Sequence, residues 1–148
     1  MSRIATILFP NGKSKTQAIP TVESWDAVVQ LIQPSLKPGI ILTLSGSLGA
    51  GKTTFVQHLA YALGAKKSAQ SPTFALMRTI PVKDKEQGIS RLIHVDAYRI
   101  EDEADLRVLD IDEELADKKS ICVLEWPEKV PNWLQKHVAH TIQLSITL

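Results

Sequence analysis

The sequence has little of several features that mark specialised classes of protein. Its single cysteine, Cys122, excludes a framework of internal disulfide bonds. No stretch approaches the ~18 consecutive apolar residues that a membrane-spanning helix needs. The apolar stretch at residues 5–9 is too short for the core of a secretion signal. These absences predict a cytoplasmic protein that has no membrane partner.

No charge of either sign dominates the chain. It carries 17 Lys and Arg residues against 16 Asp and Glu residues, whereas a protein that holds nucleic acid by itself usually has a strongly basic surface. We therefore expect any RNA to reach this protein through a partner. The 148 residues are 44% apolar, which is enough for one hydrophobic core. A single domain over residues 1–148 is the expected organisation.

Short apolar runs and helical repeats alternate along the chain. Residues 40–44 and 121–124 form apolar, partly β-branched runs, which predict two buried strands, the second of them over residues 121–125. Apolar residues recur at helical spacing over residues 22–32 and 55–63, which predicts two helices. Strands interspersed with helices are typical of an α/β layered sheet.

Weaker signals complete the expected order of elements. Thr21 and Gly64 are the expected N-cap and C-cap of the two helices. The polar stretch at residues 83–90 predicts a long hairpin connection. Further strands are predicted over residues 3–9, 73–80, 91–95 and 141–148, and short helices over residues 102–109 and 113–118.

The most specific pattern lies between a predicted strand and a predicted helix. Residues 46–53 match the phosphate-loop pattern G-x-x-x-x-G-K-[ST]. Glycines let backbone N–H groups approach phosphates at the helix N-terminus, Lys52 adds a mobile positive charge, and Thr53 offers a hydroxyl to Mg²⁺. The expected nucleotide-binding residues are Gly46, Ser47, Leu48, Gly49, Ala50, Gly51, Lys52, Thr53 and Thr54.

The alternative reading of this segment is a glycine-rich turn that only caps a helix. Lys52 would then lie unfavourably in the first turn, against the helix dipole, so the lysine favours a bound anion. No N-K-x-D or T-K-x-D motif for reading guanine is present, so ATP with Mg²⁺ is the expected ligand. The expected fold is α/β, a P-loop NTPase-like layered sheet of mixed, mostly parallel strands flanked by helices.

Two of the predicted buried strands end in an acidic residue. Asp96 and Glu125 fit as groups that bind Mg²⁺ or position water, because the carboxyl ends of parallel neighbouring strands meet at one edge of a sheet. The alternative is a pair of solvated acids at strand ends. His94 alternates with Ile93 and Val95 and so points to the opposite face, where a hydrogen-bonded structural histidine is favoured over a catalytic one.

Two further polar positions remain open between functional and structural readings. Thr73 lies in a polar Ser-Pro-Thr segment that enters a strand, where a hydroxyl could sense the terminal phosphate. Arg99 could contact phosphates, although pairing with the neighbouring acids is the more frequent outcome for such a residue.

Four segments, in this order and spacing, resemble the TsaE family of bacterial P-loop ATPases, formerly called YjeE. They are residues 46–54, Ser71-Pro72-Thr73-Phe74, His94-Val95-Asp96-Ala97-Tyr98-Arg99 and Leu124-Glu125-Trp126-Pro127-Glu128. The resemblance implies a role in the threonylcarbamoyl modification of the adenosine beside the anticodon of certain tRNAs. It also implies ATP hydrolysis that is weak alone, partnership with the TsaD and TsaB proteins, and contact with tRNA only through that complex.

The resemblance also implies roles for single residues. Lys52, Thr73 and Glu125 would serve hydrolysis; Thr53, Asp96 and Glu125 would serve the metal; and Trp126 would lie beside the nucleotide. A tryptophan before a proline is otherwise more often a packing residue. Ser47 departs from the family, which usually has an acid there, and little resemblance is visible after Pro131. Two other classes stay open: a small-molecule kinase, and a nucleotide-gated binding module that hardly turns over.

Overall fold

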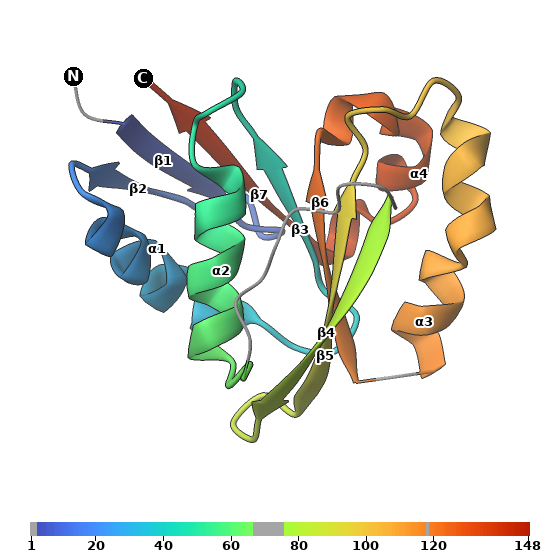
Figure 1. The fold of residues 1–148 in the computed structure, drawn as a ribbon, viewed down its shortest axis with the longest axis horizontal. Helices are drawn as coiled ribbons and strands as arrows, with labels where there is room; N and C mark the ends of the chain where they lie inside the picture. The colour runs from blue at the N-terminus through green and yellow to red at the C-terminus, as the bar shows by residue number, and fades with distance from the viewer. Residues whose placement is uncertain (1–2, 67–75, 118) are drawn as a thin grey trace.

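The computed structural model describes residues 3–66, 76–117 and 119–148 (Figure 1). The strands of this part are β1 (Arg3–Leu8), β2 (Ser14–Ile19), β3 (Ile41–Ser45), β4 (Met77–Asp84), β5 (Ile89–Asp96), β6 (Ser120–Glu125) and β7 (Thr141–Thr147). The α-helices are α1 (Trp25–Ile32), α2 (Lys52–Ala62), α3 (Ile111–Asp117) and α4 (Pro131–Gln135). Short 3-10 helices are η1 (Val22–Ser24), η2 (Gln33–Ser35), η3 (Glu103–Leu109), η4 (Pro127–Lys129) and η5 (Val138–His140).

The described strands form one mixed sheet. Its order is β2-β1-β7-β3-β6-β5-β4. The central neighbours β7, β3, β6 and β5 run parallel to one another, whereas β2, β1 and β4 join by antiparallel pairing. This arrangement confirms the predicted α/β sheet of mixed strands that is parallel in its core and flanked by helices.

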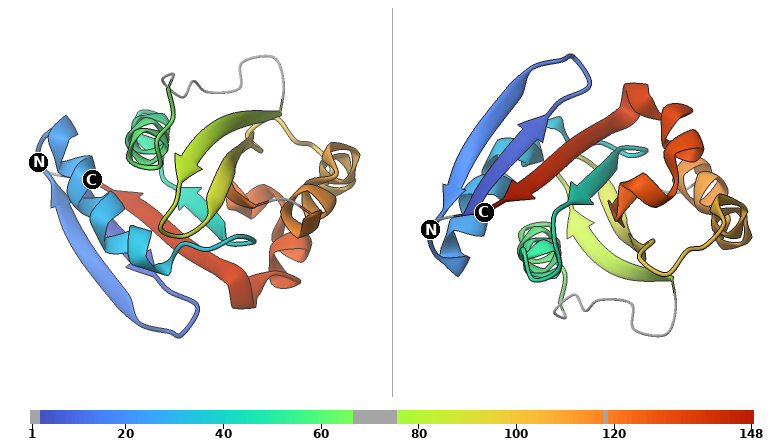
Figure 2. Two further views of the ribbon diagram at one scale, coloured as in Figure 1. Left: turned by 90° about the horizontal axis from the view of Figure 1, so that it is seen from below. Right: turned by 90° about the horizontal axis from the view of Figure 1, so that it is seen from above.

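Helices cover both faces of the sheet (Figures 1 and 2). Alternate residues of β3 show the two faces, because Leu42 packs in the core formed with α1 and α2, whereas Ile41 packs in the core formed with η3 and α3. Cys122 is buried on the second face, as a small hydrophobe would be. Burial raises the pKa of its thiol to about 12, so the thiol is protonated at neutral pH.

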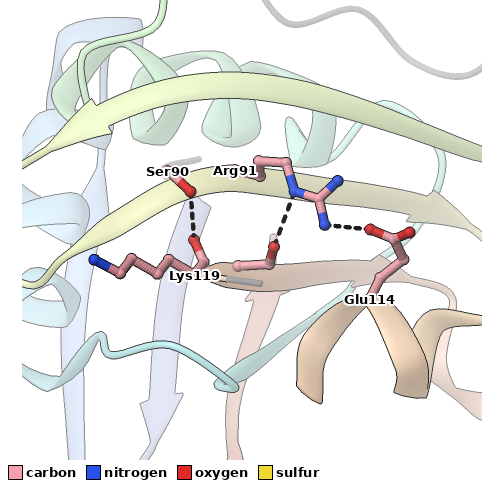
Figure 3. Close-up of polar contacts among 5 residues, drawn as sticks. Ser90, Arg91, Glu114 and Lys119 are labelled. Atoms are coloured by element: carbon pink, nitrogen blue, oxygen red, sulfur yellow. Dashed lines mark hydrogen bonds and ion pairs between the residues drawn. The ribbon is translucent and has the colours of Figure 1, made fainter. Parts of the chain in front are cut away.

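The amino-terminal ends of β5 and β6 are tied to α3 by side chains (Figure 3). Arg91 donates from Nε to Ser120 Oγ at 3.3 Å and forms an ion pair with Glu114 of α3. Ser90 Oγ donates to the Lys119 carbonyl at 3.3 Å. These contacts support the register in which β5 and β6 run side by side and end together.

The structure corrects several predicted boundaries. The hairpin connection spans only residues 85–88, because Lys83 and Asp84 still belong to β4. The helix predicted from residue 22 begins as the 3-10 turn η1 after Thr21, and α1 starts at Trp25. Residues 103–109 form a 3-10 helix, and α3 begins two residues before the predicted start at residue 113. Gly64 has the left-handed φ of 88° expected of a C-cap.

The sequence predicts neither β2 nor α4. β2 has the sequence SKTQAI and is largely exposed at the edge of the sheet, so it lacks the apolar alternation that marks a half-buried strand. α4 is only five residues long, too short for an apolar repeat to stand out. None of the helices in the described part is both long and apolar enough to cross a membrane.

Candidate functional site

Strand β3 carries the chain into the glycine loop and then into α2. Its first four residues are buried between β7 and β6, so the start of the loop is fixed in the middle of the sheet. Gly51 has φ 106°, and a Cβ there would lie 2.8 Å from Cζ2 of Trp25. The backbone therefore requires glycine at this position for two reasons. Trp25 itself packs edge-on against Phe55 of α2, with 5.7 Å between ring centroids. Through Trp25, α1 therefore packs against both the loop and α2.

A pocket of about 320 Å³ opens beside the N-terminus of α2. Its lining residues are Leu48, Gly49, Gly51, Lys52, Thr53, Thr54, Asp96, Tyr98, Glu125 and Trp126. The first N–H groups of a helix have no partners within the helix and carry its positive end, so this rim suits an anion. Gly46, Ser47 and Ala50 belong to the loop but do not line the pocket; Ala50 is buried, and its N–H donates to the Ser47 carbonyl at 3.1 Å.

Lys52 lies across the mouth of the loop. Its side chain is almost fully buried, and Nζ donates a hydrogen bond to the Gly46 carbonyl at 2.7 Å. Nζ also lies 3.7 Å from the ring centroid of Trp126. Burial lowers the pKa of the Lys52 ammonium, and the carboxylates of Glu125, Asp96 and Glu128 oppose that shift. The site therefore holds a cation close to carboxylates.

The two strand-end acids lie next to each other. β5 and β6 are parallel, and Asp96 is the register partner of Glu125, so the predicted neighbouring strand ends are confirmed. The Asp96 carboxylate accepts a hydrogen bond from the Tyr98 N–H at 3.0 Å, which orients it. Glu125 is 3% exposed, so it is not a solvated strand-end acid.

His94 is buried beside Glu125. It lies on the α2 face of the sheet, whereas Ile93 and Val95 pack in the other core, as the alternation predicts. Its Nε2 is 2.6 Å from Glu125 Oε2. The alternation in the sequence favours a hydrogen-bonded histidine but does not identify its partner. Parallel pairing of the two strands provides the missing signal, since His94 is opposite Val123, two residues before Glu125.

Aromatic rings form one wall of the pocket. Trp126 has the left-handed φ of 61°, and its ring lies 5.0 Å from that of Tyr98. Tyr98 is a site residue that the sequence does not predict, because an aromatic ring two positions after a strand end gives no specific signal. Arg99 is exposed and is not among the lining residues. Thr73 lies outside the described residues.

The donor atoms of the pocket are oxygens, the ligands that Mg²⁺ prefers. Thr53, Asp96 and Glu125 line the same pocket and supply a hydroxyl and two carboxylates. The described residues contain no group of three or more His, Cys, Asp or Glu residues placed to hold a metal ion. This donor set fits a magnesium ion whose remaining ligands are water and phosphate oxygens.

A buried parallel strand that enters a glycine loop and a helix, with acids at the carboxyl ends of the next two parallel strands, β6 and β5, defines a P-loop NTPase-like protein. Residues 19–147 match the family model described as "Threonylcarbamoyl adenosine biosynthesis protein TsaE". The chain therefore belongs to the TsaE family.

Individual relatives agree with this assignment. The tRNA threonylcarbamoyladenosine biosynthesis protein TsaE of Bacillus subtilis is 38% identical over 112 residues, which are 76% of this chain and 66% of that protein. The proteins of the same name from Mycobacterium tuberculosis and Treponema pallidum are 33% and 35% identical, over 83% and 82% of this chain and 75% and 82% of their own lengths. The chain thus spans just under two thirds of the Bacillus relative, at 66%.

A solved structure has the same fold. The crystal structure of YdiB from Bacillus subtilis is similar to this chain with a TM-score of 0.53 and 26% sequence identity. The similarity covers 88% of this chain and 70% of that one.

Proposed function

We propose that this chain binds and hydrolyses ATP with Mg²⁺, and that it does so in tRNA threonylcarbamoyladenosine biosynthesis together with the TsaD and TsaB proteins. The observation that carries the proposal is the convergence of the α2 N-terminus, Lys52 and two strand-end carboxylates on one pocket. The family membership and the names of its relatives support the pathway.

The glycine loop and Lys52 bind the phosphates. N–H groups at the start of α2 donate to phosphate oxygens, and the Lys52 ammonium leaves the Gly46 carbonyl to add its charge. Gly51 keeps the loop backbone close to Trp25, which orients these donors. The adenine preference rests on the absence of a guanine-reading motif in the sequence.

The carboxylates serve the metal and the attacking water. Thr53, Asp96 and Glu125 would hold Mg²⁺ through a hydroxyl and two carboxylates. A magnesium ion held there would supply positive charge against the charge that develops on the phosphates during transfer. Glu125 orients the water and accepts its proton, because it is the most buried acid of the pocket. Trp126 lies beside the nucleotide, and Thr73 keeps its proposed role as the residue that senses the terminal phosphate.

Partners complete the proposed activity. The chain has a formal net charge of only +1, so we propose that it meets tRNA through the TsaD and TsaB complex, in the cytoplasm. Hydrolysis by the isolated chain should be weak, as the resemblance to the TsaE family implies.

The test is phosphate release from ATP and Mg²⁺ by the purified chain, with and without the TsaD and TsaB proteins of the same organism. Strong stimulation by the two proteins supports the proposal. Phosphate transfer to a small metabolite would instead make the chain a kinase. Tight ATP binding with no turnover under either condition would make it a nucleotide-gated binding module.

A further inference from the structure

Glu125, the acid to which we assign water activation, is paired with a buried histidine. The side chain of His94 is 0% exposed and that of Glu125 is 4% exposed, and they face each other across the parallel strands β5 and β6. A buried polar pair this close restrains both side chains, because breaking the contact would leave the buried His94 ring with no hydrogen-bond partner among the described residues. Glu125 lines the pocket, whereas His94 contacts Glu125 but is not among the lining residues.

The direction of the hydrogen bond follows from the other ring nitrogen. His94 Nδ1 is buried and has no hydrogen-bond partner among the described residues. If Nε2 were the acceptor, Glu125 would have to carry a proton and the neutral ring would bury an unpaired Nδ1–H. With the proton on Nε2, the ring donates to an ionised carboxylate and leaves only a lone pair unpaired. His94 therefore donates from Nε2 to Glu125 Oε2.

This hydrogen bond distinguishes the two carboxylate oxygens of Glu125. Oε2 already accepts the hydrogen bond from His94, so Oε1 is the less committed oxygen and the one that we assign to water or metal. Without the bond, the carboxylate would be free to rotate toward the Lys52 ammonium, with which it interacts electrostatically. An ion pair with Lys52 would remove both groups from their proposed roles.

We propose that His94 is a positioning residue that holds the Glu125 carboxylate in the orientation needed for hydrolysis. The inference rests on the proposed ATPase function. It gives a function to a histidine for which the sequence pattern favours a structural role over a catalytic one. His94 contacts neither nucleotide nor metal in this role; it acts through Glu125.

Two substitutions separate positioning from packing. His94→Leu keeps an apolar side chain in the buried site and removes the donor. His94→Gln restores an N–H donor at about the reach of Nε2. We expect kcat for ATP hydrolysis to fall by about 10-fold or more in His94→Leu, with KM changed by less than about 3-fold, and to recover in part in His94→Gln. A merely structural role would give no such split and no such recovery.

The matched control is a second histidine–carboxylate pair outside the pocket. His58 of α2 contacts Asp26 of α1, with 2.8 Å between Nδ1 and Oδ1. His58→Gln should leave kcat unchanged. If His94→Leu keeps wild-type kcat, or if His94→Gln is as slow as His94→Leu, the inference is wrong.

A spectroscopic measurement decides the pairing even if His94→Leu fails to fold. The ¹⁵N chemical shifts of the His94 ring in the wild-type chain should show a proton on Nε2, and that signal should shift in Glu125→Ala. A neutral ring protonated on Nδ1 would overturn the inference. If the wild-type chain hydrolyses no ATP, with or without its partners, the proposed function fails first; normal wild-type turnover with an unaffected His94→Leu overturns this inference alone.

Discussion

The parallel centre of the sheet and its antiparallel β1–β2 edge are built from different kinds of sequence. β6 is buried along its whole length and β3 along all but its last residue, whereas most of β2 is exposed. The centre ends in the candidate site, with Asp96 and Glu125 in register at the carboxyl ends of β5 and β6. A strand that is buried on both faces has a continuous apolar sequence, so it can be predicted. The same burial fixes the position of the acid at the strand end.

The largest expected effect is in the centre. Leu42 of β3 is fully buried, so Leu42→Ala should lower the free energy of unfolding by about 2–5 kcal/mol, through lost burial and the cavity left behind. Urea unfolding of the variant and the wild type measures this loss of stability. Leu8→Ala is the matched control, because Leu8 at the end of β1 is 38% exposed and its truncation should cost less than about 1 kcal/mol. Equal costs would remove the distinction between the two regions.

Glu125→Ala tests the chemistry at the carboxyl end of the central strand β6. We expect hydrolysis to fall by roughly 10²-fold or more while ATP binding is retained, because the group that positions water is lost and the phosphate-binding groups are not. Phosphate release and binding of a fluorescent ATP analogue measure the two properties. Glu113→Ala removes an exposed acid of α3 and should change neither. Unchanged hydrolysis in Glu125→Ala would remove the role assigned to Glu125.

Lys52→Ala tests binding at the same edge of the sheet. The substitution removes the charged donor that lies over the loop, so ATP should bind about 10-fold to 100-fold more weakly, the range expected for a hydrogen bond from a charged group. Lys129→Ala, an exposed lysine of η4, is the control. Titration with the same fluorescent analogue measures both variants, and wild-type affinity in Lys52→Ala would contradict the phosphate-binding assignment.

Gly51→Ala tests how the centre holds the loop. The new Cβ would meet Trp25 at 2.8 Å in a backbone with φ 106°, so we expect a loss of about 1–3 kcal/mol in the free energy of unfolding. Gly49→Ala has a similar left-handed φ of 79° but open space around it, and so isolates the backbone strain. Thermal and urea unfolding compare the two. If Gly49→Ala is the more destabilised variant, Trp25 does not constrain the loop.

The sequence predicts the centre well because each of its signals is local. The buried run at residues 40–44 and the glycine loop after it need no knowledge of the sheet. Asp96 and Glu125 could be predicted as neighbours because parallel strands end together. The pairing of His94 with Glu125 could not be, since it depends on the register of two strands that are far apart in the chain. Tyr98 enters the pocket only through the turn after β5.

The smallest expected effect is that of a substitution in β2, at the edge of the sheet. Its size tests why the sequence does not predict this strand. Thr16 is exposed in β2 and pairs with Thr6 of β1, so Thr16→Ala should change the free energy of unfolding by less than about 0.5 kcal/mol. A solvent-facing side chain at a sheet edge contributes little to stability. The exposed residues of β2 accordingly show no apolar alternation. A loss above about 2 kcal/mol in urea unfolding would show that the edge is as strongly specified as the centre. The polar sequence of β2 would then need another explanation.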